Sequence, residues 1–382
     1  MAWSKQRLNN LFFFLGLAAV VVMLFTFDVS FVELWEHICH AGYWLIPIVG
    51  VWIIIYGINA LAWQAIIHSE LRRCGGTGVR GYENTSSTDT AADSNLVPPY
   101  PHTPVPPRTT KPRVSFWRIY RLTITGYALN YATPVGGLGG EPYRILELSK
   151  NISGQHAASS VILYAMMHFF AHFWFWFSSI FIYLGLAAVG DLPINTAIAT
   201  VLGIIIIFCL IFFWIFSRGY RKGLVVSTIH LLGRIPGLKG WSSRLLENRG
   251  ETFRNIDQQI ASLYAEDKRA FYRSLVLEYL SRVVQSSEVL FMLLLFGIDC
   301  GGGFTGITLT YLHAILIVSF TTLFANLIGF LPMQLGVQEG GFVLSIAALG
   351  LSAALGIFVS IICRVREIIW IIIGIALMKI RD

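Results

Sequence analysis

The stretch Asn130-Tyr-Ala-Thr-Pro-Val-Gly-Gly-Leu-Gly-Gly-Glu-Pro-Tyr-Arg144 interrupts apolar sequence with proline and several glycines. A second stretch, Ile328-Gly-Phe-Leu-Pro-Met-Gln-Leu-Gly-Val-Gln-Glu339, repeats this pattern near the other end of the chain. In each stretch a proline precedes a glutamate by seven residues: Pro134 and Glu141, then Pro332 and Glu339. Broken backbone at membrane depth is tolerated only where it is buried in protein or lines a cavity. Matched breaks in two halves of a membrane protein therefore point to a substrate site.

The composition indicates a membrane protein. Of the 382 residues, 55% are hydrophobic and 13% are charged, with a mean hydropathy of +0.65, whereas soluble domains average about 25% charged residues. No alternating strands typical of a membrane barrel are visible. We therefore predict an all-α polytopic protein of the cell inner (cytoplasmic) membrane. The formal charge of +7 fits basic cytoplasmic loops and does not indicate nucleic-acid binding.

Apolar runs predict about six transmembrane helices, at 11–27, 43–67, 159–188, 194–216, 271–298 and 353–378. The Pro-rich segment 74–113 cannot bury a core, so we expect it to be a disordered linker. Basic flanking residues place that linker on the cytoplasmic side, together with the basic segment 217–270 and with both termini.

Two further segments, 115–150 and 304–350, are predicted to be re-entrant helical hairpins. Neither arm of 115–150 has the roughly twenty apolar residues that a span needs. The run 304–331 could instead span, but the final helix would then leave Lys379 and Arg381 outside, against the positive-inside rule. The hairpin alternative gives an inverted repeat of residues 1–190 and 191–382, with two opposed hairpins.

Charged residues within the apolar segments are the candidate site, because burying them in a membrane is costly. Glu141 and Arg144 can pair at i,i+3. A buried arginine can clamp a phosphate with two hydrogen bonds, or it can form a structural ion pair with a glutamate. The predicted substrate-binding residues are Gly139, Gly140, Glu141, Arg144, Arg282, Glu339, Arg364 and Arg366. The predicted helix breaks are Pro134, Gly136, Gly137, Pro332 and Gly336.

Two other motifs carry weaker signals. Gly139 and Gly140 open a helix whose free N–H groups could attract an anion, although close helix packing explains such glycines equally well. His168 and His172 share a helical face at i,i+4, but zinc needs further ligands, so no metal is predicted. No nucleotide-binding or transferase motif is present, and we predict neither a catalytic residue nor a cofactor.

Taken together, Thr133-Pro134, the run Gly139-Gly140-Glu141-Pro142 with Arg144, the second motif around Pro332 and Glu339, and Arg364 resemble a known family. It is the flippase-like membrane domain of lysylphosphatidylglycerol synthetase, in its free-standing form. The resemblance covers nearly the whole chain. The synthetases add a soluble aminoacyl-transferase domain that these residues lack, so the resemblance implies lipid translocation and not lysine transfer. The Pro-rich insert at 74–113, and Gln334 and Gln338 in the second motif, depart from the expected pattern.

These observations lead to one preferred function and two alternatives. The preferred function is a lipid translocase that moves an anionic or aminoacylated phospholipid or glycolipid, passively or coupled to an ion, with the membrane lipid as its partner. An integral membrane enzyme acting on a lipid or polyprenyl phosphate would use the same buried charges for catalysis. A non-transporting scaffold for a lipid-synthesis enzyme would use the basic segment 217–270 as its docking surface.

Overall fold

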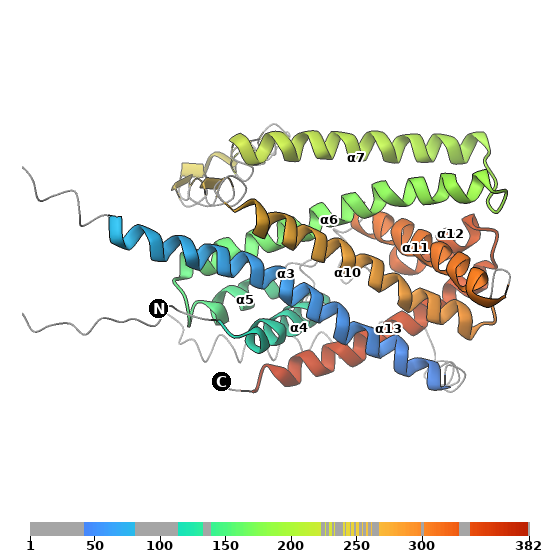
Figure 1. Ribbon diagram of the computed structural model, residues 1–382, viewed down its shortest axis with the longest axis horizontal. Helices are drawn as coiled ribbons and strands as arrows, with labels where there is room; N and C mark the ends of the chain where they lie inside the picture. Colours follow the sequence, from blue (N-terminus) through green and yellow to red (C-terminus); the bar gives the residue numbers. More distant parts are fainter. Residues whose placement is uncertain are drawn as a thin grey trace, which may run out of the picture.

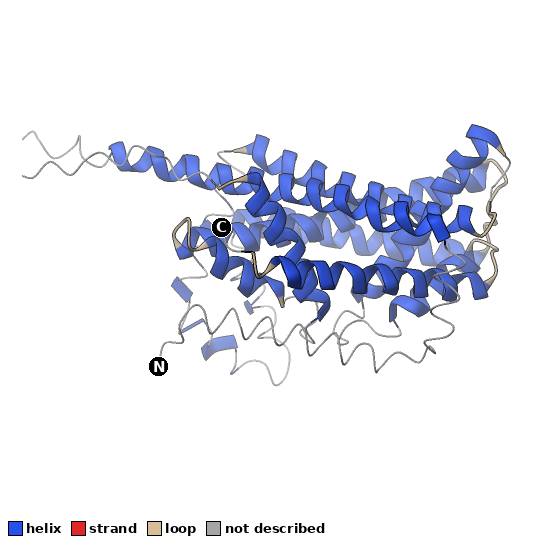
Figure 2. Cartoon of the chain, turned by 90° about the horizontal axis from the view of Figure 1, so that it is seen from below, coloured by secondary structure: helices blue, strands red, loops and turns tan. Residues whose placement is uncertain are grey.

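The computed structural model describes residues 42–80, 114–132, 139–222, 267–298, 302–327 and 337–380, and scattered residues between 226 and 261. The side chains of 73–80 and 218–222 lie outside this description. The described residues form helices joined by turns and loops, and they contain no strand (Figures 1 and 2). The prediction of an all-α protein is therefore confirmed for this part of the chain.

The described helices follow one another in a simple order. The first are η1 (Gly42–Trp44), α3 (Leu45–Arg80), α4 (Phe116–Ala132), α5 (Gly140–Leu148) and α6 (Gly154–Ala188). The others are α7 (Thr196–Lys222), α10 (Lys268–Leu295), α11 (Gly303–Leu327), α12 (Val337–Ala348) and α13 (Ala353–Leu377).

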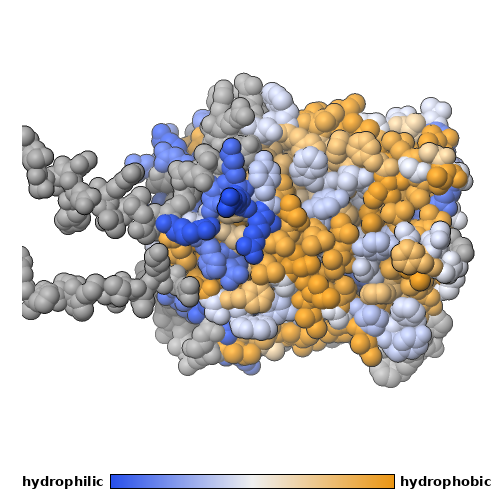
Figure 3. Space-filling model, viewed as in Figure 1, coloured by the Kyte–Doolittle hydropathy of each residue, from blue (hydrophilic) through white to orange (hydrophobic). Residues whose placement is uncertain are grey.

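Several described helices have the length and composition of membrane spans. They are Gly42–Arg72, Gly154–Ala188, Thr196–Ser217 and Gly303–Leu327. α10 and α13 are also long, with 28 and 25 residues, but they carry arginines and glutamates that turn into the protein. Figure 3 shows apolar residues over the middle of one face and hydrophilic residues gathered toward its ends. The described chain therefore has the character of a multi-pass membrane protein.

The most extensive contact between helices joins α3 to α10, and α10 also packs against α6 and α11. α3 ends and α6 begins at one end of the bundle, with α4 and α5 between them in sequence (Figure 1). α10 ends and α13 begins at the opposite end, with α11 and α12 between them. α4 packs on α13 and α11 packs on α6. The first helix of the pair α4 and α5 thus contacts α13, the last long helix of residues 191–382. The first helix of the pair α11 and α12 contacts α6, the last long helix of residues 1–190.

Some helix boundaries differ from those expected. α3 continues to Arg80, past the expected start of the linker at 74, although the added residues include three glycines, which disfavour a helix. α6 begins at Gly154, before the expected 159, because the Ser153 side chain accepts the His156 N–H and caps the helix. The expected span 11–27 and the rest of the linker, 81–113, lie outside the described residues.

Candidate functional site

Buried arginines and glutamates form the most polar part of the bundle interior. Glu278, Arg282 and Glu288 come from α10, Arg144 comes from α5, and Arg364, Arg366 and Glu367 come from α13. A charge in such an interior is stable only if it is paired and hydrogen-bonded. We call the group around Arg144 and His168 the first network, and the group around Arg364 and Arg366 the second network.

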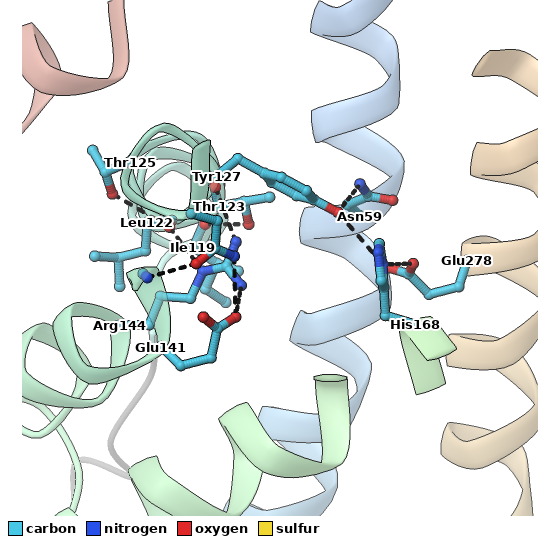
Figure 4. Close-up of polar contacts among 12 residues, drawn as sticks. Asn59, Ile119, Leu122, Thr123, Thr125, Tyr127, Glu141, Arg144, His168 and Glu278 are labelled. Carbon is cyan, nitrogen blue, oxygen red and sulfur yellow. Dashed lines mark hydrogen bonds and ion pairs between the residues drawn. The ribbon is translucent and has the colours of Figure 1, made fainter. Parts of the chain in front are cut away.

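Arg144 is the centre of one part of the first network (Figure 4). Its Nη1 donates to Glu141 Oε1 at 3.1 Å, which confirms the predicted i,i+3 pair. Its Nε and Nη2 donate to the carbonyls of Leu122 and Thr123 in α4, at 3.4 and 3.1 Å. This approach requires Gly126, because a Cβ at that position would overlap the guanidinium. The arginine therefore ties α5 to the backbone of α4.

Aromatic rings complete the surroundings of Arg144. The guanidinium carbon lies 5.7, 5.3 and 5.6 Å from the ring centroids of Trp63, Tyr127 and Tyr164. Rings at such distances attract a cation, by about 2 kcal/mol or more when the site is desolvated. Since the side chain is only 3% exposed, its charge is held by one carboxylate, two carbonyls and these rings.

The predicted glycines lie where α5 meets α4. Gly139 is buried immediately before α5, and the Gly140 N–H donates to Asn130 Oδ1 at 2.6 Å. A Cβ on Gly140 would overlap the backbone of Gly126. The structure therefore favours close helix packing for Gly140 over a free anion-binding N–H. The five predicted helix breaks, Pro134, Gly136, Gly137, Pro332 and Gly336, lie outside the described residues.

The other part of the first network joins α6 to α10. His168 Nδ1 lies 2.8 Å from Glu278 Oε2 and 2.9 Å from Arg282 Nη2. Tyr127 connects this group to Arg144, because its hydroxyl lies 3.4 Å from His168 Nδ1 while its ring faces the Arg144 guanidinium. Arg282 also donates to Gln285 at 2.9 Å. The predicted residue Arg282 is therefore part of a buried polar cluster.

The second network contains the remaining predicted residues. Arg364 donates to Glu339 and to Glu367, each at 2.8 Å. Arg366 makes two bonds to Glu288, at 2.7 and 3.3 Å. Among these groups Glu339 is the most exposed, at 31% of its side chain, whereas the two arginines are 3% and 4% exposed. Each arginine thus has at least one carboxylate partner.

The predicted residues therefore form two pairs, Glu141 with Arg144 and Glu339 with Arg364. Tyr131 of α4 interacts electrostatically with Glu367 of the second network and with Arg282 of the first. Ring contacts give a second connection, from Tyr127 to Tyr56 at 5.4 Å and from Tyr56 to Trp370 at 4.8 Å. The networks are thus linked by tyrosines of the central helices.

Some polar atoms in the networks are not satisfied. Within the described residues, Glu141 Oε2, Glu278 Oε1 and Glu339 Oε2 are buried and have no hydrogen-bond partner. Each of these glutamates uses its other oxygen for an arginine or a histidine. Because an unpaired buried polar atom costs about 1–3 kcal/mol, these oxygens are places where a donor, a cation or a proton would bind favourably.

The side chains that connect the charged residues were not predicted from the sequence. His168 and His172 do share a face of α6, with ring centroids 5.1 Å apart, but His168 pairs with Glu278. In the described part of the chain, no group of three or more His, Cys, Asp or Glu residues is placed to hold a metal. No charge pattern in the sequence indicates that Asn130 and Tyr127 belong to the first network. Their position just before the first break was the available signal.

Apolar helices of spanning length that enclose paired arginines and glutamates define a multi-pass helical membrane protein with a charged interior. The chain matches the family model of the lysylphosphatidylglycerol synthase TM region over residues 13–375. It therefore belongs to that family, and the resemblance drawn from the sequence is confirmed. No curated protein and no solved structure matches the chain.

Proposed function

We propose that this protein is a lipid translocase that moves an anionic or aminoacylated lipid across the membrane. The family supports a function connected with membrane lipids. The observation that carries the proposal is the set of ion pairs buried inside an apolar bundle. Buried ion pairs add little to stability compared with apolar packing. Intramembrane charges of this kind are typical of substrate and ion pathways.

In this proposal α4 with α5, and α11 with α12, are opposed re-entrant hairpins of an inverted repeat, and α11 re-enters although it has the length of a span. The symmetric packing of α4 on α13 and α11 on α6 supports this arrangement. So does the position of the two ion pairs, because Glu141 lies in the first turn of α5 and Glu339 lies in the first turn of α12. Each hairpin would then bring one Glu–Arg pair toward the bilayer midplane.

The two Glu–Arg pairs suggest how a headgroup binds. In both pairs the arginine is 3% exposed, whereas Glu141 is 18% and Glu339 is 31% exposed. A headgroup would therefore meet the carboxylates first. A phosphate can replace a carboxylate on a guanidinium, because both anions accept two parallel N–H bonds. A displaced glutamate could then bind the ammonium group of an aminoacylated lipid. Such an exchange of partners leaves no buried charge unpaired.

The test is reconstitution of the purified protein in liposomes of known lipid composition. We expect movement of a headgroup-labelled phosphatidylglycerol between leaflets, and enrichment of an anionic or aminoacylated lipid among the lipids that copurify. Arg144→Gln should slow the movement at least tenfold, whereas the matched control Arg273→Gln, an exposed arginine of α10, should not. Liposomes in which the folded protein moves no lipid would contradict the proposal. Chemical conversion of the lipid by the purified protein would favour the enzyme alternative.

A further inference from the structure

His168 of α6 and Glu278 of α10 contact each other at one side of the first network (Figure 4). Nδ1 of the histidine and Oε2 of the glutamate are 2.8 Å apart, and the Glu278 side chain is 0% exposed. If neither atom carried a proton, a nitrogen lone pair would face a carboxylate oxygen at hydrogen-bond distance. The contact therefore requires a proton, which sits either on the imidazole or on the carboxyl group.

Arg282 makes both proton positions possible. Its Nη2 lies 2.9 Å from Nδ1 and 3.1 Å from Nε2 of His168. A guanidinium can only donate, so whichever ring nitrogen lacks a proton still has a donor. In one arrangement Nδ1–H donates to ionised Glu278. In the other, protonated Glu278 donates to Nδ1 and the imidazole proton is on Nε2. The second arrangement contains one proton more than the first.

The unsatisfied atoms of this cluster are an independent observation. Within the described residues, Glu278 Oε1, Arg282 Nε and the Tyr164 hydroxyl are buried without a hydrogen bond of normal geometry. The Tyr164 hydroxyl nevertheless lies close to Glu278. An ionised carboxylate in an apolar interior needs several donors, whereas a protonated carboxyl group needs fewer. The hydrogen-bonding surroundings of Glu278 are thus compatible with a protonated, neutral carboxyl group.

Neighbouring charges act in the opposite direction. The titratable and charged groups around the pair are Arg282 from α10, Tyr164 and His172 from α6, Tyr127 and Tyr131 from α4, and Arg144 from α5. α3 contributes the uncharged Asn59, which donates to the Tyr127 hydroxyl at 3.3 Å. The two arginines favour ionised Glu278 and neutral His168, while burial favours a neutral carboxyl group. Because these influences oppose each other, a proton can be bound and released.

We propose that Glu278 and His168 form a proton-binding site through which lipid movement is coupled to proton movement. The coupling rests on the proposed translocase function, whereas proton binding does not. A proton taken from water converts the Glu278 carboxylate into a carboxyl group, so Arg282 loses its anionic partner and the cluster gains one positive charge. That charge favours an anionic headgroup nearby. Release of the proton restores the Glu278–Arg282 pair and favours release of the headgroup.

Proton binding is tested by infrared difference spectroscopy of the purified, full-length protein over about pH 5 to 8. The wild type should show a carboxyl band that appears as the pH falls, and Glu278→Gln should lack it. Glu147→Gln is the matched control, because it removes a carboxylate that pairs with Lys150 outside the networks. A band that remains in Glu278→Gln would overturn the proposal. If that variant does not fold, His168→Asn must shift the band, and an unchanged band has the same consequence.

Coupling is tested in liposomes that contain labelled phosphatidylglycerol and a pH difference across the membrane. We expect the pH difference to speed wild-type translocation severalfold in one direction, and Glu278→Gln to lose this response. Wild-type translocation that ignores the pH difference would overturn the coupling. A titrating carboxyl band without any lipid movement would contradict the proposed function, and with it the coupling, but the proton site would stand.

Discussion

The Arg366 guanidinium lies over the Trp52 ring, 4.0 Å from its centroid, so α13 and α3 meet through a cation and an aromatic face. Glu288 of α10 holds both residues, because it accepts bonds from Arg366 at 2.7 Å and from the Trp52 Nε1–H at 2.9 Å. The three helices therefore share one buried ion pair. Substitutions in the Glu288–Arg366 pair should therefore change the free energy of unfolding.

We predict that Glu288→Leu alone destabilises the protein by about 3–5 kcal/mol. The variant leaves the Arg366 charge buried with only the longer contact to Glu367, at 3.9 Å. The double variant Glu288→Leu with Arg366→Met should regain most of that loss, since apolar side chains of similar size often replace a buried ion pair at little cost. Equilibrium unfolding of both variants in detergent measures the difference. Equal losses in the single and double variants would show that the buried Arg366 charge is not the cause of the loss.

Close packing of α4 on α5 gives a second prediction. Gly126→Ala should lower stability and lipid movement together, because its methyl group would displace the Arg144 guanidinium. Gly185→Ala in α6 is the matched control, since nothing lies within 4 Å of a Cβ there, and alanine in a helix is favoured over glycine by up to about 1 kcal/mol. Thermal unfolding and translocation are measured on both variants. Gly126→Ala with wild-type behaviour would contradict the described position of Arg144.

The start of α10 gives a pH-dependent prediction. Burial alone raises the pKa of Asp267, but bonds from the Ala270 N–H and the Ser69 hydroxyl, with the charges of Arg72 and Arg269, outweigh burial and lower this pKa. A carboxyl group with a lowered pKa stabilises the folded state at pH values above its unfolded pKa of about 3.9, and this stabilisation is lost as the pH falls through the folded pKa.

Two variants separate the cap from the charge of Asp267. Asp267→Ala removes the helix N-cap and should cost about 1 kcal/mol. Asp267→Asn keeps a capping oxygen, so its smaller loss reports the charge. The stability difference between the wild type and Asp267→Asn should shrink in unfolding experiments as the pH is lowered from about 7 to 3. A difference that grows in acid would mean that the sign of the pKa shift is wrong.

The proposed hairpins predict a specific membrane topology. In a cysteine-free background, Lys150→Cys follows α5 and Ser352→Cys follows α12, at opposite ends of the bundle. We expect Lys150→Cys to react with an impermeant thiol reagent only after permeabilisation, and Ser352→Cys to react in intact cells. Labelling of both positions from the same side would rule out opposed hairpins.

The helical class and the matching positions of Glu141 and Glu339 could be predicted from the sequence, because long apolar runs and matched Pro–Gly breaks are local signals. The Glu141–Arg144 pair was also predictable, since i,i+3 spacing brings the two side chains together in any helix. The tertiary partners were not. Trp52 and Glu288 are 236 positions apart, and nothing in either segment encodes their contact. The contacts of His168 were likewise not predictable, because its partners Glu278 and Arg282 belong to a different helix.

Some partners of the buried arginines could not be predicted from the sequence either. A buried arginine without neighbours would suggest a ready phosphate clamp, whereas Arg364 already holds the Glu339 carboxylate of another helix. This pair depends on the packing of α12 against α13, and the bonds from Arg144 to the Leu122 and Thr123 carbonyls depend on the packing of α4 against α5. Residue types and spacing alone carry no information about that packing.

We propose that Arg144 and Arg364 bind one lipid headgroup together. The most direct test of this proposal compares translocation of labelled phosphatidylglycerol by Arg144→Gln, Arg364→Gln and the double variant, with thermal unfolding measured alongside. Residues that act as a unit show non-additive effects. If the two arginines bind one headgroup, each single variant should remain folded and lose most of its transport, and the double variant should lose little more. Losses that multiply fully, or single variants that stay folded with wild-type transport, would contradict it.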